Sequence, residues 1–300
     1  NASATVGGWY YASGAILHTL NDLTYDESTP VTHYDLDRVM MTGGSVERID
    51  DTDTDPFDKG VSPQGITLEW HNSAWVTKSA GKSRIYGNWV ILPNRTLLAV
   101  GGADNSVEDT PLVEFFGDAE VFDPGAPSSP GFWKAMADRP NYPGLTIPAP
   151  RAYHNVAILL PDGRVAVMGG AKPDDYLPHS DGTVEIFKPP YTFELRPKIT
   201  STTIPDIHYD DPFCITVQSP TTVNYAVLIG ISSVTHHFDY GQRYVELMTT
   251  TNLTSCSGGN LKILAPPLER MAPEGYYLLF VVEMRGTTRV PSKGVFVKLY

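Results

Sequence analysis

RAYHNVAILLPDGRVAVMGG, residues 151–170, combines two short apolar runs with a turn and a closing pair of glycines. The runs Val156–Leu160 and Arg164–Met168 flank Pro161-Asp162-Gly163, and this pattern predicts a β-hairpin. The pair Gly169-Gly170 predicts the end of the second strand. The stretch is therefore expected to form two antiparallel strands joined by a tight turn.

Tyr153 and His154 stand side by side at the mouth of the first predicted strand. Adjacent strand residues point to opposite faces, but the pleat is often irregular where a strand begins, so both side chains can reach one site. A phenol and an imidazole are ligands of the N and O type that copper and iron accept. The alternative is that Tyr153 packs and His154 hydrogen-bonds a turn, because most residues of these types are structural.

The same pattern occurs once earlier in the chain. Tyr86–Leu92 and Thr96–Val100 predict a strand pair, which Gly101-Gly102 closes. A strand over residues 119–124 and the aromatic pair Phe132-Trp133 follow. In the copy that contains His154, the run 184–187 occupies the place of this third strand.

A first copy is expected before residue 80. Its predicted strands are Trp9–Leu17, Arg38–Thr42, Ile66–Trp70 and Ala74–Thr77, with a polar loop over residues 18–37. A repeat of about 50 residues with up to four strands each indicates blades of a kelch-type β-propeller.

Three blades do not close a propeller, which typically has about 4–8 blades. An unclosed ring leaves exposed strand edges, which soluble proteins avoid. The missing blades are therefore expected upstream of Asn1 or from another copy of the chain. We expect the first, because the chain has no signal peptide and enters a strand-like segment within about ten residues, as a processed or truncated product does.

Residues 194–300 predict a separate antiparallel β-sandwich of immunoglobulin-like type. The Pro-rich segment 187–197 is the predicted linker, so the expected domains are residues 1–193, three propeller blades, and residues 194–300, the sandwich. The fold class is all-β. The predicted strands of the sandwich are Phe213–Gln218, Val223–Ile229, Val245–Thr250, Asn260–Ala265, Gly275–Glu283 and Gly294–Leu299.

Composition narrows the classes of partner. The net charge of -12 disfavours nucleic acid and anionic membrane surfaces, and the chain has no run of about 18 apolar residues that would cross a membrane. A neutral ligand such as a sugar or an alcohol is compatible with this charge.

Sequons at Asn1, Asn94 and Asn252 favour N-glycosylation and a secreted, extracellular protein. Cys214 and Cys256 form one disulfide or remain two buried thiols.

A second candidate for metal binding is the segment Thr235-His236-His237-Phe238, in the loop after the predicted strand Val223–Ile229. Adjacent histidines in a polar loop are often surface residues. A copper site, however, needs two or more imidazoles close together. His154 and this segment are therefore considered as one site.

These stretches together resemble the galactose oxidase and glyoxal oxidase family of mononuclear copper-radical oxidases. The resemblance covers nearly the whole chain. It is carried by RAYHNVAILLPDGRVAVMGG (151–170), VTHHFDYGQR (234–243), PEGYYLLFVVEMRGTTRVPS (273–292), EDTPLVEFFGDAEVFDP (108–124) and YGNWVILPNRTLLAVGG (86–102).

The resemblance implies one copper ion and three of its ligands. Tyr153 matches the axial tyrosine, which is also the general base, and His154 matches the first histidine ligand. His236 matches the second histidine, which a loop of the C-terminal domain delivers into the centre of the propeller. His237 stands where the family has Ser or Thr.

The family also uses a tyrosine joined to a cysteine through a thioether, and this chain has no cysteine before Cys214. In one register Ala12 replaces that cysteine and Tyr86 is its partner. In the other, the three blades are the last three of seven and the crosslink lies upstream. We expect the second, in which Tyr86 only packs near the site.

The implied reaction is oxidation of a primary alcohol or small aldehyde by O2 with release of H2O2. The substrate is then a small alcohol, an aldehyde or a carbohydrate. The alternative is a non-catalytic extracellular module on the same scaffold, which binds carbohydrate or serves a structural role. The missing cysteine and the unclosed ring favour this alternative.

Overall fold

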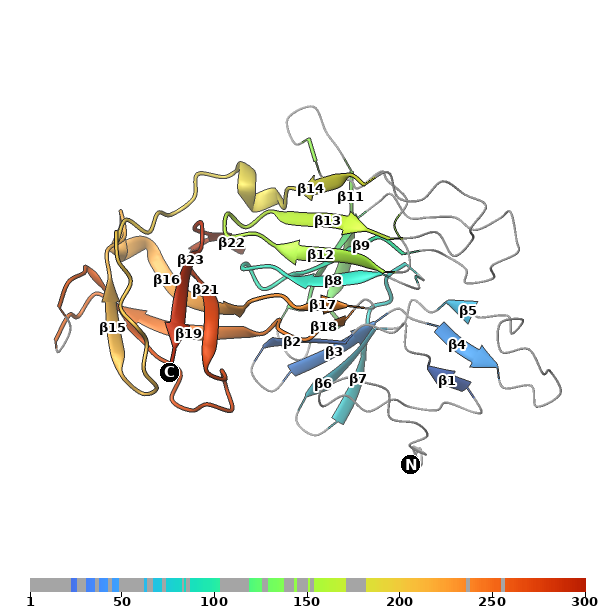
Figure 1. Ribbon diagram of the computed structural model, residues 1–300, viewed down its shortest axis with the longest axis horizontal. Coiled ribbons are helices and arrows are strands. Elements are labelled where there is room, and N and C mark those ends of the chain that lie inside the picture. The colour runs from blue at the N-terminus through green and yellow to red at the C-terminus, as the bar shows by residue number, and fades with distance from the viewer. Residues whose placement is uncertain are drawn as a thin grey trace.

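The repeated strand pairs of the sequence form separate antiparallel sheets in a computed structural model of the chain (Figure 1). Among the described residues nearly all regular structure is β, with two short 3-10 helices, so the all-β prediction is confirmed. The described residues are 23–25, 31–35, 38–42, 45–48, 62–63, 67–71, 74–82, 84, 87–102, 119–125, 129–137, 143–144, 151, 154–170, 182–235, 238–254 and 257–300.

The sheet that precedes the candidate site has the strand order β8-β9-β10-β11, in which each strand pairs with the next in the chain. The turn after β8 is closed by hydrogen bonds from Leu92 N to Thr96 O (2.8 Å) and from Arg95 N to Leu92 O (2.9 Å). All residues of β8 and β9 are buried, because both faces of these strands are covered. The strands are β8 (Asn88–Ile91), β9 (Leu97–Val100), β10 (Ala119–Asp123) and β11 (Phe132–Met136).

A second four-stranded sheet has the same meander in the order β2-β3-β6-β7. Its strands are β2 (Val31–Asp35), β3 (Arg38–Thr42), β6 (Thr67–His71) and β7 (Ala74–Lys78). The small sheet β1-β4-β5 was not predicted, and it comprises β1 (Leu23–Tyr25), β4 (Ser45–Arg48) and β5 (Ser62–Pro63).

The loop predicted over residues 18–37 is therefore wrong at β1 and β2. The polar residues of β2 suggested a loop, but this strand pairs with β3 directly after a short connection, from Asp35↔Arg38 to Val31↔Met41. The strand predicted over Trp9–Leu17 lies outside the described residues.

The sheet of the candidate site contains β12 (Asn155–Leu159), β13 (Val165–Gly169) and β14 (Val184–Phe187), in that order. The hairpin predicted around Pro161-Asp162-Gly163 is present, with Leu159↔Val165 as its last pair. The first strand begins at Asn155, one residue before the predicted Val156, and directly follows His154, whose φ of 62° interrupts the extended backbone.

The first strands of the three sheets lie next to one another. β8 packs against β2 on one side and β12 on the other (Figure 1). This arrangement is the one expected at the centre of a propeller. The number of blades and the closure of a ring stay predictions.

Residues 212–299 form a seven-stranded sheet in the order β15-β20-β19-β16-β21-β22, with β23 also paired to β21. The six strands predicted from the sequence are all present, and β22 was missed. They are β15 (Pro212–Ile215), β16 (Val223–Gly230), β19 (Tyr244–Thr250), β20 (Leu261–Leu264), β21 (Gly275–Arg285), β22 (Thr288–Pro291) and β23 (Val295–Leu299).

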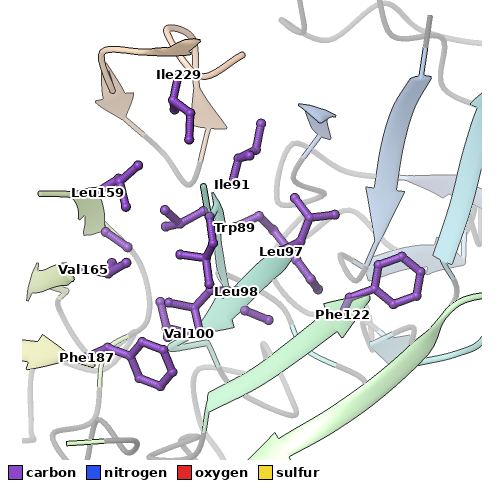
Figure 2. Packing of buried hydrophobic residues seen from close by; sticks show 14 of the residues in the cluster. Trp89, Ile91, Leu97, Leu98, Val100, Phe122, Leu159, Val165, Phe187 and Ile229 are labelled. Atoms are coloured by element: carbon purple, nitrogen blue, oxygen red, sulfur yellow. The ribbon is translucent and has the colours of Figure 1, made fainter. Parts of the chain in front are cut away.

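Strand β16 is buried on both faces where it passes between two hydrophobic cores. Ala226 and Leu228 face the core of the sandwich. Val227 and Ile229 alternate with them and face a second core, shared with β8 and β12. Figure 2 shows Ile229 close to Ile91 and Leu159 in this shared core.

The segment predicted as a linker is packed against both parts of the chain. It contains the 3-10 helix η1 (Pro190–Phe193), whose buried Tyr191 donates a hydrogen bond to Gly163 O (2.6 Å). Arg196 then donates to Asp162 O (2.6 Å) and to Pro291 O (2.7 Å), and its Nη2 also donates to Ser292 O. The turn after β12 and the end of β22 are thereby held together.

Cys214 on β15 is disulfide-bonded. The sequence holds one other cysteine, Cys256, which lies outside the described residues. Of the two alternatives left open from the sequence, the structure thus has a disulfide at Cys214. No helix among the described residues has the length and apolar character needed to span a membrane.

Candidate metal centre

The start of β12 is anchored by Arg151, whose side chain is fully buried. Its Nε donates to Glu185 Oε2 (2.8 Å), and its Nη1 donates to Gly169 O (2.8 Å). Its Nη2 donates to the backbone and hydroxyl oxygens of Thr183 (3.0 Å each). One guanidinium therefore joins the entrance of β12 to the end of β13 and the start of β14.

His154 lies in a left-handed turn between this arginine and β12. Its φ of 62° is uncommon for a residue with a Cβ atom and costs about 1 to 2 kcal/mol. The side chain is exposed. The turn removes His154 from the alternation of the strand, so the irregular strand entrance expected from the sequence is present. Such strained positions are frequent at functional sites.

Two buried asparagines fix the backbone next to His154. Asn155 directs its Nδ2 toward Arg151 O (3.5 Å), and Asn88 on β8 donates from Nδ2 to Asn155 O (3.1 Å). The second contact ties the entrance of β12 to the neighbouring sheet. The backbone at the candidate site is therefore set by two sheets together.

The preceding sheet repeats this construction. Arg84 donates to Gly101 O (2.6 Å) and to Glu120 Oε2 (3.0 Å), as Arg151 does to Gly169 O and Glu185. In both copies an asparagine follows the arginine four positions later. This arginine–glutamate pair was not predicted, although the repeated spacing of Arg and Asn is visible in the sequence.

Two short strands flank the position of the second predicted histidine ligand in the sequence. Strands β17 (Val234–Thr235) and β18 (Phe238–Asp239) pair with each other and connect β16 to β19. β17 packs against β12, and β18 packs against β8 (Figure 1). The two residues that join these strands are His236 and His237, which lie outside the described residues.

The predicted ligands are thus only partly described. His154 is described, whereas Tyr153 and His236 are not, and neither are Tyr86 and Ala12. Within the described part of the chain, no group of three or more His, Cys, Asp or Glu residues is placed to hold a metal ion. Of the described segments next to these positions, β17 packs against β12, the strand that begins directly after His154. A phenol and two imidazoles are ligand types that copper accepts.

The two internal sequons differ in their surroundings. Asn94 is half-buried in the turn between β8 and β9, and its Oδ1 accepts a hydrogen bond from the buried hydroxyl of Thr96 (2.7 Å). Asn252 is exposed after β19, and its Oδ1 accepts from the exposed hydroxyl of Thr254 (2.7 Å). The second sequon is the more accessible of the two in the folded chain.

Three comparisons connect this geometry with known proteins. Residues 196–299 match the sequence model of the family described as "Galactose oxidase-like, Early set domain". Aldehyde oxidase GLOX1 of Arabidopsis thaliana is 31% identical over 242 residues, which cover 75% of this chain and 37% of that protein. Galactose oxidase of Gibberella zeae is 27% identical over 231 residues, which cover 74% of this chain and 30% of that protein.

The resemblance to the galactose oxidase and glyoxal oxidase family is confirmed. A WSC domain-containing protein of Arthroderma benhamiae is 32% identical over 265 residues, which cover 87% of this chain and 26% of that protein. The chain therefore spans well under half the length of these curated relatives.

A solved structure supports the shared fold. It is a fungal alcohol oxidase described as being in complex with copper, and it aligns with a TM-score of 0.67 at 20% identity. The alignment covers 91% of this chain and 54% of the other. At this identity the likeness concerns the fold, and the chemistry depends on the site residues.

Proposed function

We propose that this chain is part of a copper-radical oxidase that converts a primary alcohol or a small aldehyde with O2 and releases H2O2. The observation that carries the proposal is the packing of the hairpin β17–β18 against β12 and β8. The strands on either side of residues 236–237 thereby contact β12, which begins directly after His154, and β8. Relatives named aldehyde oxidase and galactose oxidase support the same reaction class.

In this proposal Tyr153, His154 and His236 hold one copper ion. His154 is presented by its left-handed turn, and His236 is presented by the hairpin of the sandwich. Tyr153 accepts the hydroxyl proton of the substrate as a general base. When bound, copper supplies one-electron chemistry and an open position for substrate and then O2.

Electron balance requires one more group. Oxidation of an alcohol to an aldehyde removes two electrons and two protons, which O2 takes up as H2O2. A single copper ion exchanges one of the electrons. We assign the other to a tyrosine bonded to a cysteine through a thioether, supplied by propeller blades outside the 300 residues of this chain.

We also propose that the protein is secreted and carries N-linked glycan at Asn252, the exposed sequon.

A carbohydrate-binding or structural module is the second candidate function. It is favoured by exposed aromatic rings on neighbouring strands, where Tyr276 is 62% and Phe296 is 59% exposed. Such rings are suited to stack on sugar faces.

Peroxide release by the full-length, copper-loaded protein tests the proposal. Galactose and methylglyoxal are the test substrates, and the expected result is one H2O2 for each O2 consumed, lost on removal of copper by a chelator. After reduction of disulfides and enzymatic removal of N-linked glycan, which restores a mass that can be compared with the sequence, the protein should still be two hydrogens lighter than expected because of the thioether. A protein that lacks this mass loss and releases no peroxide, yet binds oligosaccharides, is the module of the second candidate.

A further inference from the structure

A buried glutamine side chain links the base of the hairpin β17–β18 to the neighbouring sheet. Gln242 follows β18 and is 8% exposed. Its Nε2 donates to Trp89 O (2.8 Å), and its Oε1 accepts from Ile91 N (2.8 Å). Both partners are backbone groups of β8, two residues apart.

These two backbone groups lie on the free edge of β8. Strand β8 is the terminal strand of its sheet. Leu92 donates its backbone N–H to Thr96 O, on the side of the strand that faces β9. Trp89 and Ile91 therefore direct their carbonyl and amide groups away from β9. The primary amide of Gln242 supplies one acceptor and one donor, as a residue of a neighbouring strand does.

The backbone that carries Gln242 is fixed by Asp239. Its Oδ1 accepts hydrogen bonds from Ser233 N (2.8 Å), Gly241 N (3.0 Å) and Gln242 N (3.2 Å). These bonds connect the two sides of the hairpin base.

The base is also closely packed. A Cβ atom at Gly230 would clash with the carbonyl oxygen of Gly241, and one at Gly241 would clash with that of Ile231. The hairpin therefore has little freedom to move relative to Gln242.

We propose that Gln242 and Asp239 are positioning residues of the copper centre. Gln242 fixes the hairpin on β8, Asp239 transmits that position to the hairpin base, and the hairpin tip then presents His236 to the entrance of β12. Neither residue touches copper or substrate. The inference rests on the proposed function, because it needs His236 to be a ligand.

The test compares Gln242→Glu with Gln218→Glu in the full-length protein. Glutamate at position 242 still accepts from Ile91 N, but it has no donor for Trp89 O and places a negative charge beside that carbonyl. Gln218 is exposed on the sandwich and provides the same chemical change away from the hairpin. Cu(II) affinity and the electron paramagnetic resonance spectrum of bound Cu(II) are measured for both variants and for the unsubstituted protein.

We expect Q242E to bind Cu(II) about tenfold more weakly, with altered copper hyperfine splitting, and Q218E to be unchanged. If Q242E does not fold, Gln242→Asn is read in the same way, since it keeps the amide but is one methylene too short to make both bonds. Wild-type affinity and spectrum in the folded variant would overturn the inference alone. Failure of the unsubstituted protein to bind Cu(II) would overturn the proposed function and this inference with it.

Discussion

At the scale of single residues, the entrance of each of two neighbouring strands is organised by a buried arginine. Arg84 and Arg151 each bond a glycine carbonyl and a glutamate of their own sheet. A buried cation that keeps all of its partners holds its surroundings in one geometry, whereas one that loses its anion is costly. The turn containing His154 is built on the second of these arginines.

Replacement of Glu185 by Gln tests this role. The substitution leaves Arg151 buried without its counter-charge, so we expect the free energy of unfolding to fall by about 3 kcal/mol. Asp162→Asn is the matched control, because Asp162 and Arg164 form a partly exposed pair and the loss should stay under about 1 kcal/mol. Denaturant unfolding of both variants measures the difference, and equal losses would contradict the role assigned to Arg151.

Buried phenols predict a loss of stability at alkaline pH. Burial raises the pKa of Tyr277 from 10.0 to about 12, and its hydroxyl donates to Pro273 O (2.7 Å). Because the folded-state pKa lies above the unfolded value, the native state retains this proton more tightly. The contribution of Tyr277 to the free energy of unfolding is fully present below pH 10 and is lost as the pH rises toward 12.

Tyr277→Phe should therefore reduce the slope of stability against pH between pH 10 and 12, since it removes one titrating group. Burial also raises the pKa of Tyr191 and Tyr244, so these residues keep part of the slope. The measurement is the free energy of unfolding in denaturant at several alkaline pH values. An unchanged slope would show that Tyr277 titrates alike in both states.

Some site residues can be predicted from their neighbours in the chain. Tyr153 and His154 are predicted as ligands because they precede a strand with a clear turn behind it. Gln242 was missed, because its partners Trp89 and Ile91 lie about 150 residues away in the sequence. No local sequence pattern identifies a side chain that hydrogen-bonds the edge of a distant strand in place of a neighbouring strand.

At the scale of elements, strands with a clear apolar run in the sequence were predicted well, whereas strands that depend on pairing with a partner were not. β8 and β9 carry continuous apolar runs, and their bounds were nearly correct. β17 and β18 have two residues each, which is too short for any periodicity. They exist because they pair with each other and pack against β12 and β8.

The glycine at the end of β13 is predicted to shape the candidate site. Gly169 has a φ of 67°, and a Cβ atom there would come within 3.0 Å of His154 O. Gly182 has a φ of 71° with no atom within 4 Å of such a Cβ. Both Gly→Ala changes therefore carry the left-handed cost of about 1 to 2 kcal/mol, and only G169A also displaces the turn of His154.

We expect G169A to lose more unfolding free energy than G182A and to bind Cu(II) more weakly than the unsubstituted protein. Denaturant unfolding and copper titration measure the two effects. Equal behaviour of the two variants in both assays would mean that the contact with His154 O does not constrain the site.

At the scale of the whole molecule, the sheets before residue 194 and the sandwich after it share one hydrophobic core. Val227 and Ile229 of β16 join Trp89 and Leu159 of the preceding sheets in this core. Because both faces of β16 and β21 are covered, these strands read as continuous apolar runs in the sequence. The sequence predicted them as strands but did not predict which face meets the other sheets.

Arg196 is expected to couple the unfolding of the two parts. Arg196→Ala leaves the carbonyl groups of Asp162, Pro291 and Ser292 without their donor, which should cost about 3 kcal/mol. All five tryptophans precede residue 194, so tryptophan fluorescence reports mainly the first part, together with the shared core around Trp89, whereas circular dichroism reports both parts.

The unfolding transitions followed by fluorescence and by circular dichroism should coincide in the unsubstituted protein and separate in R196A. Arg164→Ala, which removes an exposed arginine of the same turn, is the control and should keep them together. Coincident transitions in R196A would show that the apolar core alone couples the parts.

The central claim is that one copper ion is held by a histidine from the strand entrance before β12 and a histidine from the sandwich hairpin. Electron paramagnetic resonance of the full-length protein loaded with one Cu(II) tests it most directly. We expect nitrogen couplings from two imidazoles, of which His154→Ala and His236→Ala each remove one. Couplings that persist unchanged in both variants would contradict it.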